Sequence, residues 1–370
     1  MTAVLKGVKI CYFGHYAPDY SRNRIIMKAL RKAGTEVIEV NNRAHAILRY
    51  PKLFAKSIFK RFDLMIVGYI GNTDMPLARL VCTLKGVPLI FDAFLSLYEA
   101  NVTDRKLSRP GSLSAQRWYY FDRIACRLAD AVLLDTNTHI QYFREMFSIP
   151  EKKFIRIQVG ADDEVLSPEK NKVKIGNSEF GVIFFGYFIP LHGLEYIIEA
   201  ARILEIKGER VQFVIVGGGQ TYPLIRALAE KQNMNSVNFT GRMPYAKLRL
   251  LIQQSDLCLG IFGATPKAQR VIPNKVFDGL AMAKCVITAD TPAIREALTH
   301  GENIWLCEPG NGKALADAIL TLKDNKVLRE SIAENGYQYF KNHFSVEALS
   351  RDLTEVVKDL LQRKKKKKPF

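Results

Sequence analysis

Long apolar runs and a secretory leader are both missing from this 370-residue sequence. The longest apolar stretches, at residues 182–189 and 257–264, are far below the roughly 18–20 residues that a membrane-spanning helix needs. The apolar run at residues 8–13 is too short for a signal peptide, and no small-residue cleavage site follows it. We therefore expect a globular chain that neither spans a membrane nor carries an export signal.

Paired cysteines are also missing, because the six cysteines are scattered and no two have the spacing of metal ligands. Most of them lie inside apolar segments, which is typical of buried free thiols. Such thiols fit a reducing cytoplasm and argue against a disulfide framework. The six residues are Cys11, Cys82, Cys126, Cys258, Cys285 and Cys307.

Acidic residues are too few to balance the basic ones, and the formal net charge is +17. One basic run, at residues 43–61, contains no acid, and apolar residues separate its cations. On a helix this run would form an apolar stripe flanked by cations, although Pro51 would break or restart the helix. The run favours an anionic membrane surface, and the alternative is a surface helix packed on a sheet. The predicted membrane contacts are Arg43, Arg49, Lys52, Lys56, Lys60 and Arg61.

A second basic run closes the chain at residues 363–370, where it is either functional or a solvated end. Nucleic acid would also suit the charge. However, the sequence has no stacking-aromatic motif, zinc-finger spacing or helix-turn-helix pattern, so we expect no nucleic-acid partner.

Short apolar segments alternate with amphipathic ones along the chain, which is typical of parallel sheets covered by helices. Segments of strand length occur at residues 8–13, 36–40, 64–67, 88–91, 131–134, 154–157, 181–185, 211–216, 237–239, 257–260, 286–288 and 304–306. The polar stretch 162–178 lacks an apolar period and is interpreted as a linker. We predict an α/β fold with two doubly wound domains, whose facing sheet edges form a ligand cleft. The predicted boundaries are 1–168 and 169–342 for the domains, 343–362 for a closing helix and 363–370 for the tail.

The turn after the first predicted strand runs from Gly14 to Arg24 and opens a helix. Ser21 could cap that helix, and Arg22 and Arg24 add positive charge near its amino end. The turn is therefore a candidate anion site, with His15 as a candidate contact for a second substrate; the alternative is an ordinary turn with solvated arginines.

Two further candidates follow strands of the first domain. Asp92 comes after residues 88–91, where a carboxylate could orient or deprotonate a substrate hydroxyl, or could simply cap the next segment. His139 follows residues 131–134 and is a candidate contact for the acceptor substrate, although a surface or capping histidine fits equally well.

Glycine turns follow two predicted strands of the second domain, at Gly186 and at Gly217-Gly218. Glycine there allows a ligand or another segment to come close. The dinucleotide pattern G-x-G-x-x-G is absent, and the strand at residues 237–240 ends without an acid to hold a ribose. A dinucleotide site is therefore not expected.

The stretch at residues 270–288 reads as a loop, a helix and a buried strand. Pro273 suits a helix start, and Lys275 and Asp278 lie one turn apart on one face. The helix amino end and Lys275 would meet phosphate, while Asp278 would accept from ribose hydroxyls. The stretch therefore predicts a site for a nucleoside diphosphate.

Residues 180–345 resemble, in order, the motifs of family 4 retaining glycosyltransferases of the GT-B fold. Residues 186–193 (GYFIPLHG) resemble the loop G-R-x-x-x-x-K-G, and residues 213–219 (FVIVGGG) resemble the following strand and turn. Residues 237–242 (VNFTGR) and 255–259 (SDLCL) resemble the next segment, and 274–288 (NKVFDGLAMAKCVIT) the final signature. The resemblance implies donor contacts by Gly14, Arg22, Arg24, Gly186, Tyr187, His192, Gly217, Gly218, Arg242, Arg270, Asn274, Lys275 and Asp278.

Three positions depart from that family pattern. Arg270 stands where the signature has the first of two acids, and it cannot accept hydrogen bonds from sugar hydroxyls. Arg270 would instead bind the diphosphate or an acidic sugar. Tyr187 and His192 stand where the donor loop has its arginine and lysine. Positive charge for the leaving diphosphate would then come from Lys275, Arg270, Arg242 and the arginines that follow Ser21.

The resemblance implies a glycosyltransferase that moves a sugar from a nucleoside-diphosphate sugar to a hydroxyl of a glycan or glycolipid precursor. It further implies retention of anomeric configuration and no metal ion or other cofactor. Asp92, from its position after a strand, is the first candidate for the carboxylate on the acceptor side. With the basic runs, it predicts a cytoplasmic protein peripheral to the membrane. The altered signature leaves two alternatives: a non-catalytic GT-B protein that acts as scaffold or regulator, and a nucleotide-sugar epimerase of the same architecture.

Overall fold

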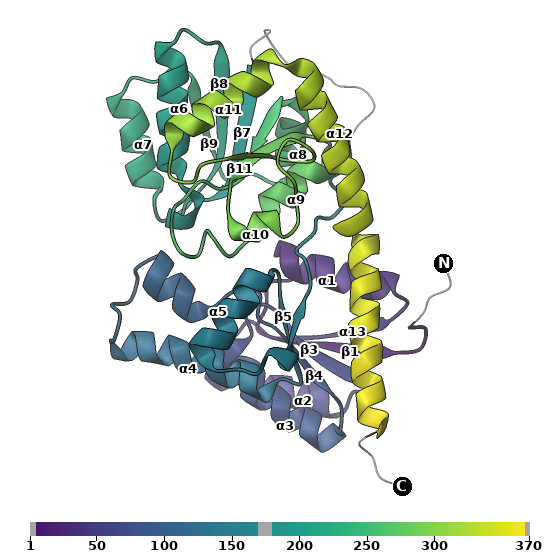
Figure 1. Ribbon diagram of the computed structural model, residues 1–370. Helices are drawn as coiled ribbons and strands as arrows, with labels where there is room; N and C mark the ends of the chain where they lie inside the picture. Colours follow the sequence, from purple (N-terminus) through teal and green to yellow (C-terminus); the bar gives the residue numbers. More distant parts are fainter. Residues whose placement is uncertain (1–4, 169–179, 367–370) are drawn as a thin grey trace. The chain divides into compact units, whose positions relative to one another are not determined.

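The computed structural model describes residues 5–168 and 180–366, except the side chains of residues 46, 47, 365 and 366 (Figure 1). The chain divides into two units, each with its own six-stranded sheet. Unit 1 comprises Met1–Val159 and Val346–Phe370, and unit 2 comprises Gly160–Ser345.

The boundary between the two units follows Val159, and the predicted boundary followed Pro168. The residues between these two positions belong to unit 2, because they form hydrogen bonds with it. The backbone N–H of Ala161 donates to the carbonyl of Phe344, and Arg249 donates to the carbonyl of Ser167. The predicted linker at 162–178 falls largely outside the described residues.

Unit 1 contains a parallel sheet with the strand order β2-β1-β3-β4-β5-β6. Its strands are β1 (Lys9–Gly14), β2 (Glu36–Asn41), β3 (Leu64–Val67), β4 (Leu89–Asp92), β5 (Ala131–Leu134) and β6 (Phe154–Arg156). The three central strands β3, β4 and β5 are buried along their whole length. Helices cover both faces of such a sheet, which explains why these strands appear in the sequence as unbroken apolar runs.

The helices of unit 1 correct the sequence predictions at two residues. The helices are α1 (Ser21–Lys32), α2 (Ala46–Ile58), α3 (Met75–Lys85), α4 (Leu113–Leu128), α5 (Asn137–Phe147) and α13 (Val346–Lys366), with a π-helix at Glu99–Asp104. Ser21 does not cap α1, because the N-cap position belongs to Tyr20 and no side chain bonds there. Pro51 does not break α2. Its ring is exposed, while Leu53 of the same helix is fully buried, so packing offsets the one missing backbone bond.

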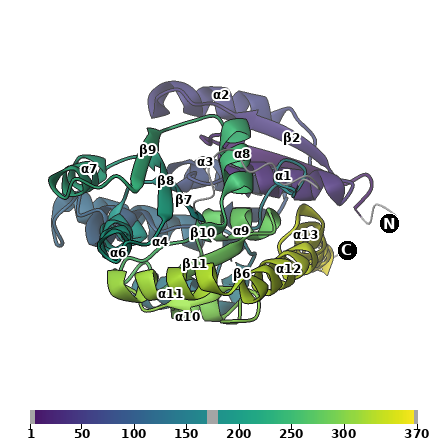
Figure 2. The same ribbon diagram turned by 90° about the horizontal axis from the view of Figure 1, so that it is seen from above.

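The closing helix α13 belongs to unit 1, where it lies beside α1 in both views of the chain (Figures 1 and 2). Leu349, Leu353 and Val357 of α13 are fully buried with Ile26 and Leu30 of α1. This apolar face holds the C-terminal segment on the unit formed by the N-terminal segment.

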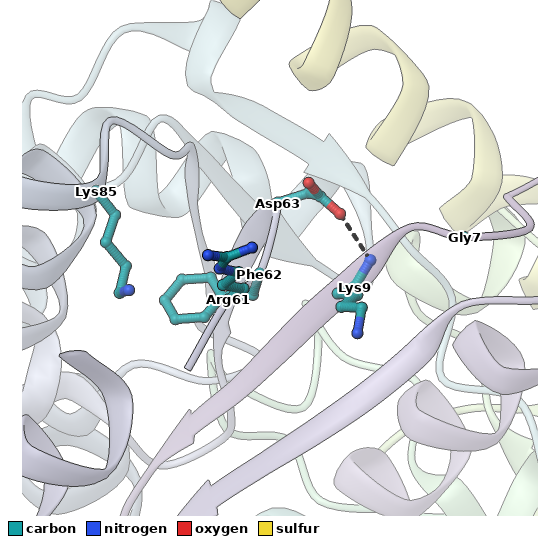
Figure 3. Close-up of a pocket in the computed structure, with 6 residues that line it drawn as sticks. All are labelled: Gly7, Lys9, Arg61, Phe62, Asp63 and Lys85. Carbon is teal, nitrogen blue, oxygen red and sulfur yellow. Dashed lines mark hydrogen bonds between the residues drawn. The ribbon is translucent and has the colours of Figure 1, made fainter. Parts of the chain in front are cut away.

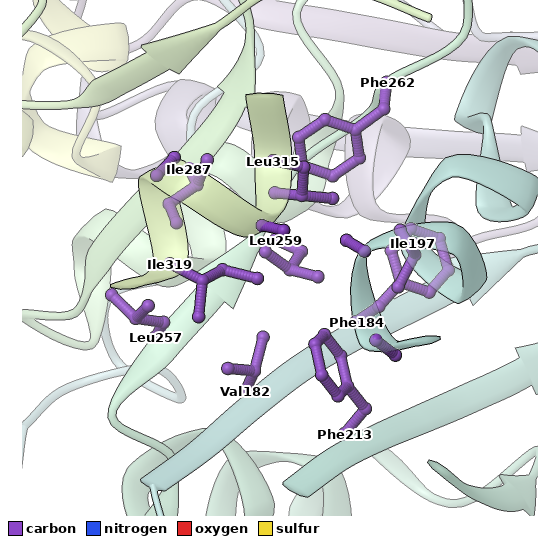
Figure 4. Close-up of a cluster of buried hydrophobic side chains, with 14 of the residues drawn as sticks. Val182, Phe184, Ile197, Phe213, Leu257, Leu259, Phe262, Ile287, Leu315 and Ile319 are labelled. Atoms are coloured by element: carbon purple, nitrogen blue, oxygen red, sulfur yellow. The ribbon is translucent and has the colours of Figure 1, made fainter. Parts of the chain in front are cut away.

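Unit 2 contains a second parallel sheet with the order β12-β11-β10-β7-β8-β9. Its strands are β7 (Phe180–Tyr187), β8 (Val211–Gly218), β9 (Val237–Gly241), β10 (Leu257–Leu259), β11 (Cys285–Ala289) and β12 (Trp305–Cys307). Its helices are α6 (Leu194–Ile206), α7 (Tyr222–Lys231), α8 (Tyr245–Gln254), α9 (Asn274–Ala281), α10 (Pro292–Arg295), α11 (Gly312–Asp324) and α12 (Lys326–His343). Figure 4 shows the core between this sheet and α6 and α11, where Val182, Leu259 and Ile319 are fully buried.

All six cysteines are buried and free, as predicted. None of the described helices has both the length and the apolar composition that a bilayer-spanning segment requires.

Candidate donor site

Two glycines let the ends of β7 and β8 approach each other and the start of α9. Gly186 and Gly217 are paired in the sheet register, and their φ angles of +139° and +135° favour glycine. A Cβ atom on Gly217 would lie 1.9 Å from the carbonyl oxygen of Gly186. A Cβ atom on Gly186 would lie 3.3 Å from Cε of Lys275. Packing therefore requires a glycine at position 217, the φ angles favour glycine at both positions, and Lys275 fills the space beside Gly186.

His192 is anchored in the loop that follows β7. Its Nδ1–H donates to the carbonyl of Tyr187, and the ring is largely buried. Its Nε2 lies 3.2 Å from Nζ of Lys275. Since Nδ1 is the donor in this arrangement, Nε2 of the neutral ring accepts from the lysine ammonium. The histidine thus orients the lysine.

Lys275 stands in the first turn of α9 and is only 5% exposed. Its Nζ lies 4.8 Å from the centroid of the Phe184 ring. Burial lowers the pKa of Lys275 to about 7, against the opposing effect of the Asp278 carboxylate. An ammonium has three N–H donors, and His192 is its hydrogen-bond partner within the part of the chain that the structure describes. A buried ammonium that has unused N–H donors and stands at the amino end of a helix is well suited to bind an anion.

Asp278 lies one helical turn after Lys275 and is 6% exposed. The hydroxyl of Tyr245, in the first turn of α8, donates to Oδ1 of Asp278 at 3.2 Å. The tyrosine fixes the orientation of this carboxylate. Sequence reasoning missed Tyr245, because its partner lies in another helix and no spacing connects the two.

A cation lies over the ring of Tyr187, the residue that stands where the family pattern has an arginine. The guanidinium of Arg242, which follows β9, lies 5.0 Å from the centroid of the Tyr187 ring. The same side chain approaches Gly218, where a Cβ atom would be 4.0 Å from Nε. Arg242 therefore brings positive charge to the loop position where the family pattern has arginine, as Lys275 does beside His192.

Arg270, in the segment that leads into α9, and Asn274, the first residue of α9, are half-buried. The backbone N–H of Arg270 donates to the carbonyl of Lys267. Lys267 is only 4% exposed, and sequence analysis did not single it out, because nothing in the spacing of that loop distinguishes it. This segment therefore holds two cations rather than one.

In unit 1, Arg22 and Asp92 form an ion pair with no solvent exposure. Nε and Nη2 of Arg22 donate to the carboxylate at 2.9–3.1 Å, and Nη1 donates to the carbonyls of Ile157 and Gln158. Burial is the largest effect and lowers the pKa of Arg22, but the charge and hydrogen bonds of Asp92, together with the charge of Asp135, outweigh it and raise the pKa overall. Each side chain is satisfied by the other, so their burial favours a structural role. The predicted roles as phosphate contact and acceptor-side carboxylate stay predictions.

Asp74 organises the predicted anion turn of unit 1, and sequence reasoning missed it. Its Oδ2 accepts from the backbone N–H of His15 at 2.6 Å, and a Cβ atom on Gly14 would lie 2.9 Å from the same oxygen. Its Oδ1 accepts from Nε of Arg49 at 2.9 Å. Arg24 is half-buried in the first turn of α1. The turn is therefore held by a carboxylate from the short 3-10 helix Asn72–Asp74, which follows β3.

His139 is fully buried, so the alternative of a surface histidine is wrong. Its Nδ1 lies 2.9 Å from Asp135, and its Nε2 lies 3.7 Å from Glu99 in the π-helix. Capping of α5 is performed by Thr136, whose hydroxyl accepts from the backbone N–H of His139. The contact of His139 with an acceptor stays a prediction.

Most of the predicted membrane-contact cations are exposed, and one is not. Arg49 is 8% exposed and bonds to Thr73 and Asp74, so its burial does not favour membrane contact. The exposed members are Arg43, Lys52, Lys56, Lys60 and Arg61. Two large apolar side chains of the same run are also exposed, Leu48 at 62% and Phe59 at 87%.

The family model described as "Glycosyl transferases group 1" matches residues 167–339, most of unit 2. An uncharacterised glycosyltransferase of Methanocaldococcus jannaschii is 26% identical over 245 residues, 63% of this chain and 66% of the relative. The alpha-D-kanosaminyltransferase of Streptomyces kanamyceticus is 24% identical over 289 residues, 76% of this chain and 73% of the relative.

Among solved structures, HepE of Anabaena in complex with UDP-glucose is similar with a TM-score of 0.73 and 16% identity. The match covers 95% of this chain and 99% of the HepE chain. At that identity the likeness concerns the fold alone, and it confirms the predicted GT-B fold. Together the similarities support a glycosyltransferase of the GT-B fold; they do not extend to family 4 or to retention, which stay predictions.

Proposed function

We propose that the protein transfers a sugar from a nucleoside-diphosphate sugar to a hydroxyl of a glycan or glycolipid precursor. The observation that carries this proposal is the buried ammonium of Lys275. It is held by His192 at the amino end of α9 and lies one turn before Asp278. The matches to glycosyltransferases give the reaction class.

The proposed chemistry depends on positive charge around the leaving diphosphate. Lys275, the amino end of α9 and the Arg242–Tyr187 pair would stabilise the negative charge that develops as the sugar leaves. Asp278, oriented by Tyr245, would accept from the ribose hydroxyls. Transfer with retention and without a resident metal ion belongs to the proposal through the family 4 resemblance.

UDP sugars are the first donors to test, since HepE, which has the same fold, is described with UDP-glucose. A thermal-shift panel of nucleoside-diphosphate sugars, repeated with Lys275→Met, tests the donor site. We expect one donor class to stabilise the native protein and to have little effect on the variant. Equal shifts in both proteins, or no shift with any donor, would contradict the proposed site.

Acceptor dependence separates this function from its alternatives. A transferase consumes the donor when an acceptor is present, whereas an epimerase converts it without one. A scaffold protein would bind the donor and leave it unchanged. Only consumption that requires an acceptor supports the proposal.

We also propose that the protein acts in the cytoplasm at the membrane surface. The exposed cations Lys52, Lys56 and Lys60 and the exposed side chains of Leu48 and Phe59 support this part. Cations attract anionic lipid headgroups, and the two apolar side chains would enter the interface.

A further inference from the structure

A basic pocket of about 390 Å³ lies at the amino-terminal edge of the unit 1 sheet (Figure 3). We call it the basal pocket, and it is lined by Gly7, Lys9, Arg61, Phe62, Asp63 and Lys85. Lys9 is the first residue of β1, and Asp63 immediately precedes β3. The candidate residues Gly14 and Asp92 stand at the opposite, carboxyl ends of their strands. The basal pocket is therefore separate from the residues proposed to bind substrates in unit 1.

Three cations line the basal pocket against one carboxylate. Asp63 accepts from the backbone N–H of Lys9 at 2.8 Å, the bond drawn as a dashed line in Figure 3. The ammonium of Lys9 pairs with Glu36 at 2.9 Å, and both side chains are about half exposed. Arg61 is exposed and has no ion pair among the residues that the structure describes. The pocket thus has an uncompensated guanidinium.

Lys85 is held in place at the side of the pocket. Its Nζ donates to the carbonyl of Lys60 at 2.8 Å and lies 5.1 Å from the centroid of the Phe62 ring. One of its three N–H donors is used by this carbonyl. The ammonium can therefore bind an anion without a large loss of side-chain freedom, because the side chain is already ordered.

Exposed apolar side chains stand next to these cations. Phe59, at the end of α2, is 87% exposed, and Leu84, in the last turn of α3, is 61% exposed. Each precedes one member of the hydrogen-bonded pair Lys60 and Lys85 in the sequence. Isolated exposed apolar residues are ordinary, but here they flank cations at the ends of two helices that contact each other.

We propose that the basal pocket binds the phosphate group of an anionic phospholipid, with Phe59 and Leu84 entering the membrane interface. A free phosphate would account for the cations but not for the exposed apolar side chains beside them. A phospholipid headgroup accounts for both. This inference deepens the membrane part of the proposed function by assigning it a site, and it is independent of the donor site in unit 2.

Vesicle sedimentation at low ionic strength tests the proposal on the full chain without any nucleotide sugar. We expect retention by phosphatidylcholine vesicles that contain phosphatidylglycerol and little retention by phosphatidylcholine alone. R61Q/K85Q should lower the partition coefficient about tenfold or more. K231Q/K247Q, which removes two exposed cations of unit 2, should leave it nearly unchanged.

A second variant distinguishes weaker vesicle binding from misfolding. Phe59→Ser changes a side chain that is almost wholly exposed, and it should weaken retention while the unfolding midpoint stays the same. Equal retention of wild type and R61Q/K85Q would overturn the proposal. So would release of the protein by a short RNA at matched ionic strength, because that result assigns the pocket to a nucleic acid. Failure of the donor assay would leave this result intact, since the two measurements share no ligand.

Discussion

Nζ of Lys275 lies 3.2 Å from Nε2 of His192, and this contact joins the first turn of α9 to the loop after β7. In the family pattern that residues 186–193 resemble, the position of His192 carries a lysine. Here the cation comes from another element and the histidine orients it. The structure thus keeps a positive charge at the donor loop through a different residue.

Lys275→Met should weaken the binding of the nucleoside-diphosphate sugar by roughly 10- to 100-fold, because a charge-assisted hydrogen bond contributes about 1.5–3 kcal/mol. Calorimetric titration of the donor measures this loss. Lys247→Met removes an exposed cation of α8 and serves as the control. Similar affinities of the two variants would show that Lys275 does not contact the donor.

The same substitution should stabilise the free protein, and the gain should depend on pH. The pKa of Lys275 is lowered to about 7 by burial, so the unfolded chain binds more protons than the folded one between pH 7 and the ordinary lysine pKa of 10.5. The stability cost of Lys275 is therefore full below pH 7 and disappears as the pH rises toward 10.5. Urea unfolding of wild type and Lys275→Met across this range should show a stability gap that narrows with increasing pH. A constant gap would contradict the lowered pKa.

Donor affinity should also fall as the pH rises above 7. A bound diphosphate favours the ammonium form of Lys275, so binding takes up a proton wherever the free side chain is neutral. Titrations in buffers of different ionisation enthalpy measure that uptake. The Lys275→Met variant should show none, and an equal uptake in the variant would assign the proton to another group.

Arg242→Gln should weaken donor binding, and the double variant Tyr187→Arg/Arg242→Gln should recover much of the loss. The guanidinium of Arg242 stacks on Tyr187, so an arginine at position 187 would return the charge to the same loop. Comparing the donor affinities of the wild type and both variants tests this prediction. If the double variant binds as weakly as Arg242→Gln, the two arginine positions are not equivalent.

Gly217→Ala should disturb the donor loop, because the added Cβ would lie 1.9 Å from the carbonyl of Gly186. We expect a lower unfolding midpoint and weak donor binding. Gly208→Ala is a matched control, since Gly208 has a φ of +73° but nothing within 4 Å of the added Cβ. Equal effects of the two substitutions would attribute the result to backbone strain alone.

Asp92→Asn should destabilise unit 1 by about 3–5 kcal/mol, because it leaves the buried guanidinium of Arg22 without its carboxylate. The double substitution Arg22→Met/Asp92→Leu should recover most of that stability, as urea unfolding will show. A stable Asp92→Asn variant that has lost transfer would instead support the acceptor-side role predicted for Asp92.

The sequence predicts the sheets well, because strands buried on both faces must be apolar and short. Each of the twelve strands in the described part of the chain lies within one or two residues of an expected segment, and β3 and β5 coincide with residues 64–67 and 131–134. Predictions that depended on the chemistry of single residues were less accurate. Ser21 has capping character but lies inside α1, and the exposed Pro51 is accommodated because packing elsewhere holds α2.

The side-chain partners of the site were beyond prediction, because they join segments that are far apart in the sequence. Arg22 and Asp92 are 70 residues apart, and His192 and Lys275 are 83 residues apart. No periodicity connects such positions, and only the fold brings them together. The sequence did name Arg242 and Lys275 among the cations that could replace the two missing loop cations, but it could not show that Arg242 lies over the Tyr187 ring and that Lys275 contacts His192.

The most direct test of the account is transfer of a labelled sugar from nucleoside-diphosphate sugars to a membrane lipid and glycan extract, with wild type and Lys275→Met in parallel. The account predicts labelled product from one donor class, dependent on the extract and strongly reduced in the variant. Absence of product with every donor, or donor turnover that is unchanged when the extract is omitted, would contradict it.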